Sequence, residues 1–283
     1  MILLIFFFEA LLGAVALGAF LPVSAIWARV LIAVGGFFGI FLALNILYIL
    51  VLLVWSLFLG HREAKKDSPF YRAMTVRTIK WIFHILRIRV TLEGKEKVPD
   101  CPIVLVSNHR SDFDPMAALV AFPKRKLAYI SKPSNLKIPI AGAFVLRCSF
   151  LAINRENPRE ALGTLKKAAK LIREQGLDIG IYPEGTRSYR GGPKPFKEGA
   201  FLMAKQAGAP IVLMTTEGTE SIAGRVIFHR NHVKLRVIEV LSAEEVATKP
   251  ARTLMQEAEE ILFAALNTTP EEVKTAEQQA AKS

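Results

Sequence analysis

The sequence predicts an α/β protein in which a mostly parallel sheet is covered by helices on both faces and is preceded by an N-terminal transmembrane helical hairpin. Two observations support this fold class. The first 60 residues are almost wholly apolar, and Glu9 and Arg29 are their only acidic or basic side chains. From residue 88 onward, short apolar runs of strand length alternate with helical patterns. That alternation is typical of parallel sheets.

The apolar first part, residues 1–60, contains two runs long enough to cross a membrane. Residues 2–21 would extend about 30 Å as a helix, which matches a bilayer core. Residues 30–59 would extend about 45 Å, so this run must tilt, kink or reach into the headgroups. A cleaved signal peptide is the alternative for the first run, but that run lacks a basic N-terminal region and contains Glu9. We therefore expect a membrane anchor of two hydrophobic helices.

Positive charge is confined to the rest of the chain. The formal net charge is +12, and because Glu9 and Arg29 cancel, all of it lies in residues 61–283. Such basic chains bind nucleic acid or anionic lipid; the apolar anchor favours anionic membrane lipid, and no nucleic-acid-binding motif is found. Basic residues directly follow the second apolar run, which by the positive-inside rule places the following domain on the cytoplasmic side. A bacterial-type inner or cell membrane is the expected location.

Residues 61–89 form a basic amphipathic segment. Bulky apolar side chains are interleaved with arginine and lysine between residues 70 and 89. A helix lying on an anionic membrane surface has this composition. An ordinary domain helix with its basic side chains in solvent fits the pattern equally well. The basic residues are Arg72, Arg77, Lys80, Arg87 and Arg89.

The alternating pattern continues through residues 90–267, and residues 268–283 form a polar tail that we expect to be disordered. The clearest helix is 158–175, where apolar residues recur at helical spacing until Gly176. The segment 226–240 resembles a terminal hairpin. We predict strands at 88–93, 102–107, 127–130, 149–153, 177–182, 210–216, 224–229 and 233–240, and helices at 115–122, 139–146, 158–175, 197–207 and 251–266.

The densest polar cluster, SNHRSDFDP at residues 107–115, directly follows an apolar strand. His109 therefore lies at the carboxyl end of a strand, where open α/β sheets bind ligands. An imidazole with an ordinary pKa near 6.5 can accept a proton at neutral pH, and a carboxylate is needed to fix its tautomer. Asp112 and Asp114 are both close enough to serve. The structural alternative is a strand-to-helix turn in which Asp114 caps the helix that Pro115 begins.

Two further polar loops follow apolar strands. One is IYPEGTRSYRGG (181–192), which holds the acid Glu184, the flexible Gly185, the hydroxyl of Thr186 and the guanidinium of Arg187 in succession. An arginine guanidinium suits bidentate binding of phosphate. The alternative is a glycine-rich turn with a surface arginine. FLAINREN (150–157) ends in Asn154 and Arg155. Because the strands are predicted to be parallel, we expect the three loops to form one pocket.

No set of metal ligands stands out. The chain has two cysteines, Cys101 and Cys148, and they do not form a CxxC pair, so a disulfide framework or zinc site is not expected. A fourth segment, GAPIVLMTTEGT (208–219), is a buried strand that opens into polar residues.

Taken in order, the blocks NHRSDFD, FLAINRE, YPEGTRS and APIVLMT resemble the four ordered blocks of the glycerolipid acyltransferase family, and within it the 1-acyl-glycerol-3-phosphate (lysophosphatidic acid) acyltransferases. The resemblance covers about residues 70–240, and four blocks together are specific where one is not. It implies that residues 90–267 are an acyltransferase domain. Tyr182 stands where the family more often has phenylalanine.

The resemblance implies transfer of an acyl chain from acyl-CoA or acyl carrier protein to the free hydroxyl of lysophosphatidic acid, with no cofactor. His109 would take the hydroxyl proton and Asp114 would orient the imidazole. Arg187 and Arg155 would hold the acceptor phosphate. Glu184, Gly185 and Thr186 would shape the loop, and Lys197 would add a second cation.

The sequence leaves other functions open. Within the same class, the acceptor could be another lysophospholipid or glycerol 3-phosphate. From a different class, the chain could be a non-catalytic, membrane-anchored lipid-binding protein. The intact set of His109, Asp114, Glu184 and Arg187 argues against that reading.

Overall fold

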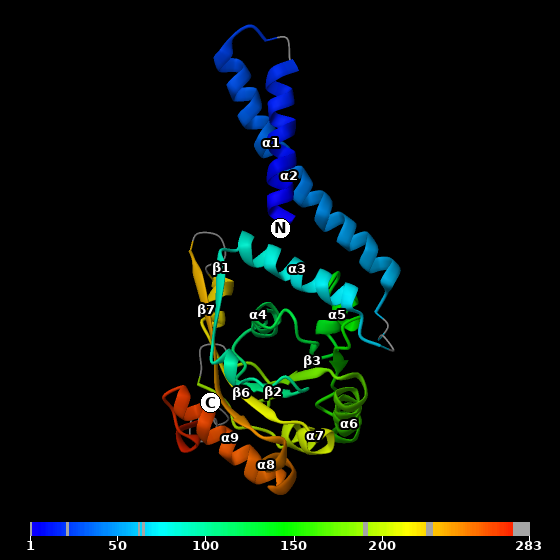
Figure 1. The fold of residues 1–283 in the computed structure, drawn as a ribbon, viewed down its shortest axis with the longest axis vertical. Helices are drawn as coiled ribbons and strands as arrows, with labels where there is room; N and C mark the ends of the chain where they lie inside the picture. The colour runs from blue at the N-terminus through cyan, green and yellow to red at the C-terminus, as the bar shows by residue number, and fades with distance from the viewer. Residues whose placement is uncertain are drawn as a thin grey trace. The chain divides into compact units, whose positions relative to one another are not determined.

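A computed structural model describes residues 2–20, 23–61, 63, 66–188, 192–224 and 229–273 (Figure 1). The chain divides into two compact units, Met1–Gly60 and His61–Ser283. Each unit has its own internal packing and is described separately.

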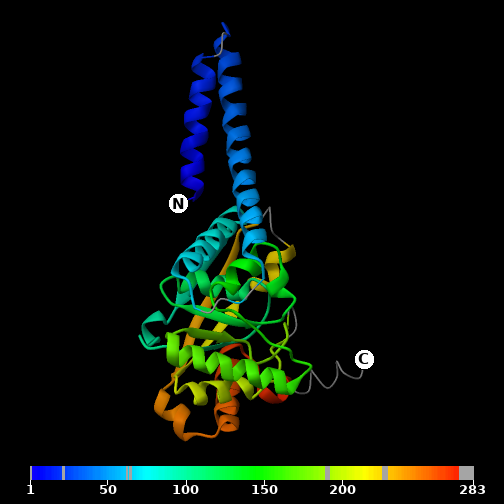
Figure 2. The ribbon, with the colours of Figure 1, turned by 90° about the vertical axis from the view of Figure 1, so that its right-hand side faces the viewer.

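The first unit is a hairpin of two apolar helices, α1 (Ile2–Phe20) and α2 (Ile26–Leu59) (Figure 2). Both are long and apolar enough to cross a membrane, and α2 is one continuous helix across its glycines. Small residues allow close contact between them, because a Cβ at Gly13 would lie 2.7 Å from Ile40 Cδ1. Such small-residue contacts are typical of helices packed in membranes.

The second unit is built on a seven-stranded sheet whose order is β1-β7-β6-β2-β5-β3-β4. The neighbours β6, β2, β5, β3 and β4 are parallel to one another. Strand β7 is antiparallel to β6, and β1 is parallel to β7, so this pair runs opposite to the other five. The prediction of a mostly parallel sheet is confirmed. The strands are β1 (Ile88–Glu93), β2 (Val104–Ser107), β3 (Leu127–Ser131), β4 (Leu151–Ala152), β5 (Asp178–Ile181), β6 (Ile211–Glu217) and β7 (Asn231–Leu241).

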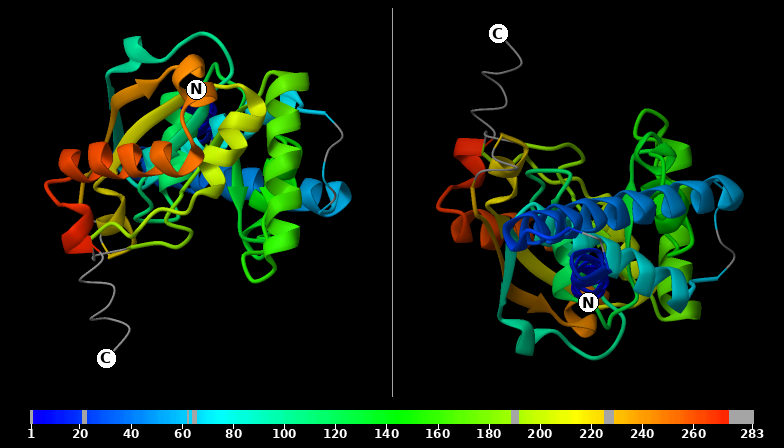
Figure 3. Two further views of the ribbon diagram at one scale, coloured as in Figure 1. Left: turned by 90° about the horizontal axis from the view of Figure 1, so that it is seen from below. Right: turned by 90° about the horizontal axis from the view of Figure 1, so that it is seen from above.

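Helices cover both faces of this sheet, as the sequence predicts (Figures 1 and 3). One face carries α3, α4 and α5, and the other carries α6, α7 and α9. The bounds are α3 (Pro69–Ile85), α4 (Asp114–Ala121), α5 (Ala141–Leu146), α6 (Pro158–Gln175), α7 (Gly199–Ala207), α8 (Ala243–Thr248) and α9 (Ala251–Ala265), with short 3₁₀ turns η1 (Lys95–Lys97), η2 (Asn135–Lys137) and η3 (Thr219–Gly224).

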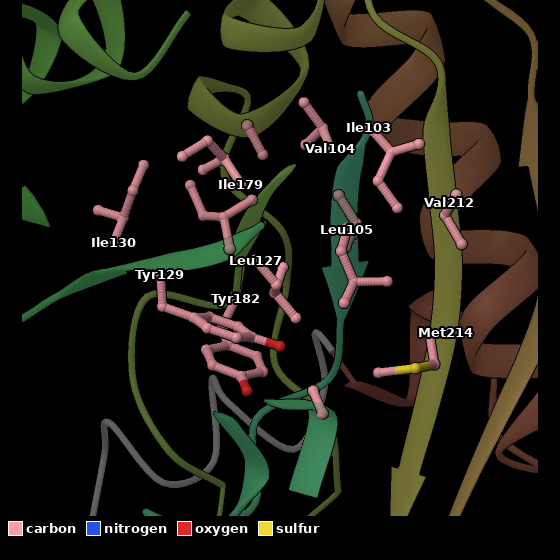
Figure 4. Close-up of a cluster of buried hydrophobic side chains, with 14 of the residues drawn as sticks. Ile103, Val104, Leu105, Leu127, Tyr129, Ile130, Ile179, Tyr182, Val212 and Met214 are labelled. Atoms are coloured by element: carbon pink, nitrogen blue, oxygen red, sulfur yellow. The ribbon is translucent and has the colours of Figure 1, made fainter. Parts of the chain in front are cut away.

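The core lies between the sheet and these helices. All four residues of the central strand β2 are buried, as expected for a strand covered on both faces. Side chains of neighbouring strands pack beside it, including Ile179 and Met214 (Figure 4). This rigid centre fixes the positions of the loops that leave its strands.

Helix α3 contributes one face to the same core. Its side chains Val76, Ile79 and Phe83 are buried there. Arg72 is only 7% exposed and is paired with Asp67, so it is not available to lipid. Exposed side chains of this helix include Arg77 and Lys80.

Two predicted segments differ from the structure or fall outside it. Of the tail 268–283, residues 270–273 are helical and Val273 is buried in the core, so the prediction of disorder is wrong there; residues 274–283 lie outside the described residues. The predicted strand 224–229 falls largely on 225–228, also outside the described residues. The predicted strand 233–240 lies within β7 (Asn231–Leu241), which pairs with both β1 and β6.

Candidate active site

The three predicted loops leave the carboxyl ends of parallel strands. The loop after β2 carries His109, the loop after β5 carries Glu184 to Arg187, and Arg155 follows β4. Since β6, β2 and β5 are neighbours, the segment after β6 joins the same edge. The side chains predicted from sequence therefore meet at one place.

His109 and Asp114 form a direct pair. His109 Nδ1 lies 2.8 Å from Asp114 Oδ2, and the carboxylate is fully buried. The same oxygen accepts hydrogen bonds from the backbone N–H of Arg110 (2.7 Å) and Ser111 (2.8 Å). A carboxylate so placed selects the tautomer with the proton on Nδ1, which leaves Nε2 of the imidazole free to act as a base.

The structure decides between the two aspartates that the sequence left open. Asp114 is the first residue of α4, and Phe113 is the N-cap without a side-chain capping bond. The Asp114 carboxylate turns back to the preceding loop, so the capping alternative is wrong. Asp112 instead forms an ion pair with Arg187.

Aromatic rings support the imidazole from one side. The His109 and Tyr182 rings are stacked, with centroids 4.1 Å apart and an interplanar angle of 9°. Tyr182 in turn stacks on Tyr129 at 5.4 Å, and Figure 4 shows these two tyrosine rings face to face. A Cβ at Gly180 would lie 2.3 Å from the Tyr129 ring, so only glycine leaves room for it.

Glu184 connects the loop after β5, hereafter the second loop, to the loop after β2, hereafter the first loop. Its Oε1 accepts the His109 backbone N–H at 2.6 Å, and its Oε2 accepts the Lys194 backbone N–H at 3.0 Å. The side chain is 2% exposed, and burial raises the pKa of Glu184 to about 7 against the lowering effect of these two donors. Ser188 completes the connection by donating its N–H and Oγ–H to the His109 carbonyl, at 2.8 and 3.0 Å.

Cationic side chains gather around the second loop. Arg155 donates to the carbonyl of Gly185. Burial, with a further contribution from the charge of Arg187, lowers the pKa of Arg155. Lys197 packs on Gly185, where a Cβ would lie 3.1 Å from its Nζ and where φ is +74°. The loop thus concentrates positive charge beside His109, as an anion-binding site requires.

The structure adds residues that the sequence reasoning missed. Lys194 Nζ donates to Thr186 Oγ1 at 2.9 Å and is a further cation of the loop. The clustering of lysines in PKPFKEG was the available signal. Thr219, the last residue of the segment GAPIVLMTTEGT (208–219), donates a hydrogen bond to Asp114. No group of three or more His, Cys, Asp or Glu side chains that could hold a metal occurs among the described residues.

Comparison with known proteins defines the class. A family model described as Acyltransferase matches residues 89–216, a range that includes all eight predicted site residues. An uncharacterized acyltransferase of Schizosaccharomyces pombe is 30% identical over 187 residues, covering 64% of this chain and 67% of that protein. The chain belongs to the acyltransferase family.

Several relatives carry more specific names. The chain is 31% identical over 194 residues to the chloroplastic 1-acyl-sn-glycerol-3-phosphate acyltransferase of Arabidopsis thaliana, covering 66% of this chain and 52% of the relative. It is 27% identical over 177 residues to the Saccharomyces cerevisiae enzyme of the same name, covering 60% and 58%. The chain therefore spans a little over half the length of these two relatives.

A solved structure shares the fold. The crystal structure of the 1-acyl-sn-glycerophosphate (LPA) acyltransferase, PlsC, from Thermotoga maritima matches with a TM-score of 0.55 at 22% identity, covering 70% of this chain and 77% of that one. The similarity supports the same α/β architecture for the second unit.

Proposed function

We propose that this chain transfers an acyl group from an acyl thioester to the free hydroxyl of 1-acyl-glycerol-3-phosphate and so forms phosphatidic acid. The observation that carries the proposal is the His109–Asp114 pair beside Arg187 of the loop after β5, with Arg155 of the loop after β4 bonded to that same loop. A base for a hydroxyl and cations for a phosphate are the two groups that this acceptor needs. The names of the relatives point to the same acceptor.

The proposed reaction needs no covalent enzyme intermediate. His109 Nε2 takes the proton of the acceptor hydroxyl as its oxygen attacks the thioester carbonyl carbon. The new ester C–O bond forms, the C–S bond breaks, and the imidazolium returns the proton to the leaving thiolate. The buried Asp114 carboxylate stabilises the imidazolium between these steps.

The proposed phosphate site consists of Arg187 and Arg155, supported by Lys197 and Lys194. Arg187 is held by Asp112 at the surface, and such an exposed pair is weak enough for a phosphate to compete with it. Glu184, Gly185 and Thr186 hold the loop in shape through the backbone bonds of Glu184 and the tight turn at Gly185.

The direct test is an acceptor and donor panel. Purified protein in mixed micelles is offered lysophosphatidic acid, other lysophospholipids and glycerol 3-phosphate, each with acyl-CoA or acyl carrier protein as donor. Product formation from lysophosphatidic acid is expected. Transfer to a different acceptor alone would reassign the substrate, and lipid binding without transfer by any pair would favour the non-catalytic alternative.

We further propose that the helical hairpin inserts in a membrane and that the basic residues of 61–89 contact anionic lipid, with the acyltransferase unit on the cytoplasmic side. Exposed Arg77 and Lys80 on α3 are suited to this contact. Salt screens exposed charges over about 8 to 10 Å but leaves apolar insertion intact. The full chain should resist extraction by salt, whereas a chain lacking residues 1–60 should leave anionic vesicles at high salt. Release of the full chain by salt alone would contradict insertion.

A further inference from the structure

The segment after β6, Gly218-Thr219-Glu220, contacts the first loop at two points. Thr219 Oγ1 donates to Asp114 Oδ1 at 2.5 Å. Arg110 Nε lies 3.2 Å from Glu220 Oε2, which also accepts the Gly218 backbone N–H at 3.1 Å. Two of these contacts involve the loop that carries His109, although the partners are about a hundred positions apart in sequence.

The backbone of this segment is built to bring Thr219 to the carboxylate. Gly218 has φ of +89°, and a Cβ there would lie 2.2 Å from the carbonyl oxygen of His232 on β7. Only glycine accommodates both the left-handed conformation and the close approach. The turn that Gly218 permits begins η3 and buries Thr219 completely, at 0% exposure.

The Thr219 bond completes the hydrogen bonding of Asp114. Oδ2 already accepts from His109, Arg110 and Ser111, whereas Oδ1 accepts from Thr219. The last torsion of an aspartate side chain has only broad, shallow minima. A donor on each oxygen therefore fixes the carboxylate plane, and with it the direction of the bond to Nδ1.

We propose that Thr219 is a positioning residue that acts through Asp114 to hold the His109 imidazole in its orientation and tautomer. This inference rests on the proposed function, in which His109 is the base. The hydroxyl of Thr219 donates to Asp114 and not to the His109 imidazole. Its expected signature is a loss of turnover without a loss of substrate binding.

The test compares three substitutions by steady-state acyl transfer. Thr219→Val keeps the shape but removes the hydroxyl, and kcat should fall about 10- to 100-fold, the effect of losing a hydrogen bond to a charged group. Both Michaelis constants should stay within about twofold. Thr219→Ser restores the hydroxyl and should retain near-wild-type kcat. Thr215→Val is the matched control, because Thr215 lies on β6, is 0% exposed, and its Oγ1 has no hydrogen-bond partner within the described part of the chain.

The result that would overturn the proposal is a Thr219→Val variant with unchanged kcat, or a Thr219→Ser variant that loses as much as Thr219→Val. If Thr219→Val does not fold, Thr219→Ala is used in its place. Alanine also removes the hydroxyl but adds no methyl group, and its kcat is compared with that of Thr219→Ser in the same way.

A second readout does not depend on turnover, so it separates this proposal from the proposed function. The chain has five histidines, and ¹⁵N-histidine NMR can assign His109 by the signal lost in His109→Ala. Wild type and Thr219→Ser should show the tautomer with the proton on Nδ1, and Thr219→Val should show a mixture. An unmixed tautomer in Thr219→Val would contradict the positioning role even if the wild type transfers no acyl group.

Discussion

The two loops that meet at the active site are held in different ways. In the loop after β2, the polar side chains of Asn108, Ser111 and Asp114 are at most 6% exposed, and Asp114 alone accepts four hydrogen bonds. In the loop after β5, the Arg187 side chain is 34% exposed and is held by a surface ion pair. Proton transfer requires a fixed geometry, whereas phosphate binding requires cations that a ligand can reach.

Glu184 is the exception that joins the loops. It belongs to the second loop but is as buried as the residues of the first, and it accepts the backbone N–H of His109. The comparison therefore predicts effects on rate for the first loop, effects on acceptor binding for the exposed part of the second, and an effect on stability for Glu184.

The largest expected effect is on turnover. His109→Ala should lower kcat by about 10² to 10⁴, the usual contribution of a general base. The thermal midpoint should fall modestly, because the variant loses the ring stack on Tyr182 and the bond to the buried Asp114 carboxylate, so kcat is measured well below that midpoint. His232→Ala on the exposed side of β7 is the matched control and should keep wild-type rates. A His109→Ala variant that retains near-wild-type turnover would show that His109 is not the general base.

The next effect is on stability. Burial raises the pKa of Glu184 from 4.5 to about 7, so between these values the folded chain keeps a proton that the unfolded chain has lost. Unfolding free energy should therefore fall as pH rises through this window, by about 3 kcal/mol in total. Below pH 4.5 both states are protonated, and above pH 7 both are ionised, so no further change is expected from this group.

Urea unfolding of wild type and Glu184→Gln in detergent, at pH values from 4.5 to 7.5, measures this effect. The difference between the two proteins should change with pH, because the glutamine does not titrate. Parallel stability curves would show that Glu184 is ionised throughout and that its backbone donors outweigh burial.

The smallest effect concerns the ion pair between the loops. Asp112→Ala should free Arg187 for the acceptor phosphate and lower the acceptor Michaelis constant about two- to fivefold, since exposed pairs contribute at most about 1 kcal/mol. The donor constant should not change. Glu93→Ala, which breaks the similarly exposed Lys234–Glu93 pair on β1 and β7, is the control. A raised acceptor constant in Asp112→Ala would mean that Asp112 holds Arg187 in its binding orientation.

Local patterns in the sequence predicted much of the fold. The helix 158–175 matches α6 at both ends, because its apolar spacing, Asn157 cap and Gly176 are all local signals. The pairing of β7 with β1 was not predictable, because it joins residues such as Ile88 and Asn231 that are far apart in sequence. The burial of Arg72 was also missed, since its partners include the distant carbonyl of Cys148.

The site likewise has a part that local sequence signals predict and a part that depends on contacts between residues far apart in sequence. The eight predicted residues follow strands, and a parallel sheet brings strand ends together, so the structure places them at one edge. Spacing alone could not choose between Asp112 and Asp114, because that depends on how α4 begins. Thr219 could not be assigned, because its contact with Asp114 joins the start of η3 to the start of α4, which are about a hundred positions apart in sequence.

The central claim is that the first loop supplies the base and the second loop binds the acceptor phosphate. It is tested most directly by measuring how strongly the enzyme prefers an acceptor that carries a phosphate. The measurement is kcat/KM for 1-acyl-glycerol-3-phosphate divided by that for 1-acyl-glycerol, in wild type and in Arg187→Ala. Loss of a charged hydrogen bond to phosphate should lower this ratio about 10- to 100-fold. The kcat/KM for 1-acyl-glycerol-3-phosphate should fall, and that for 1-acyl-glycerol should not change. If Arg187→Ala slows both acceptors equally and leaves the ratio unchanged, Arg187 does not bind the phosphate and the account is contradicted.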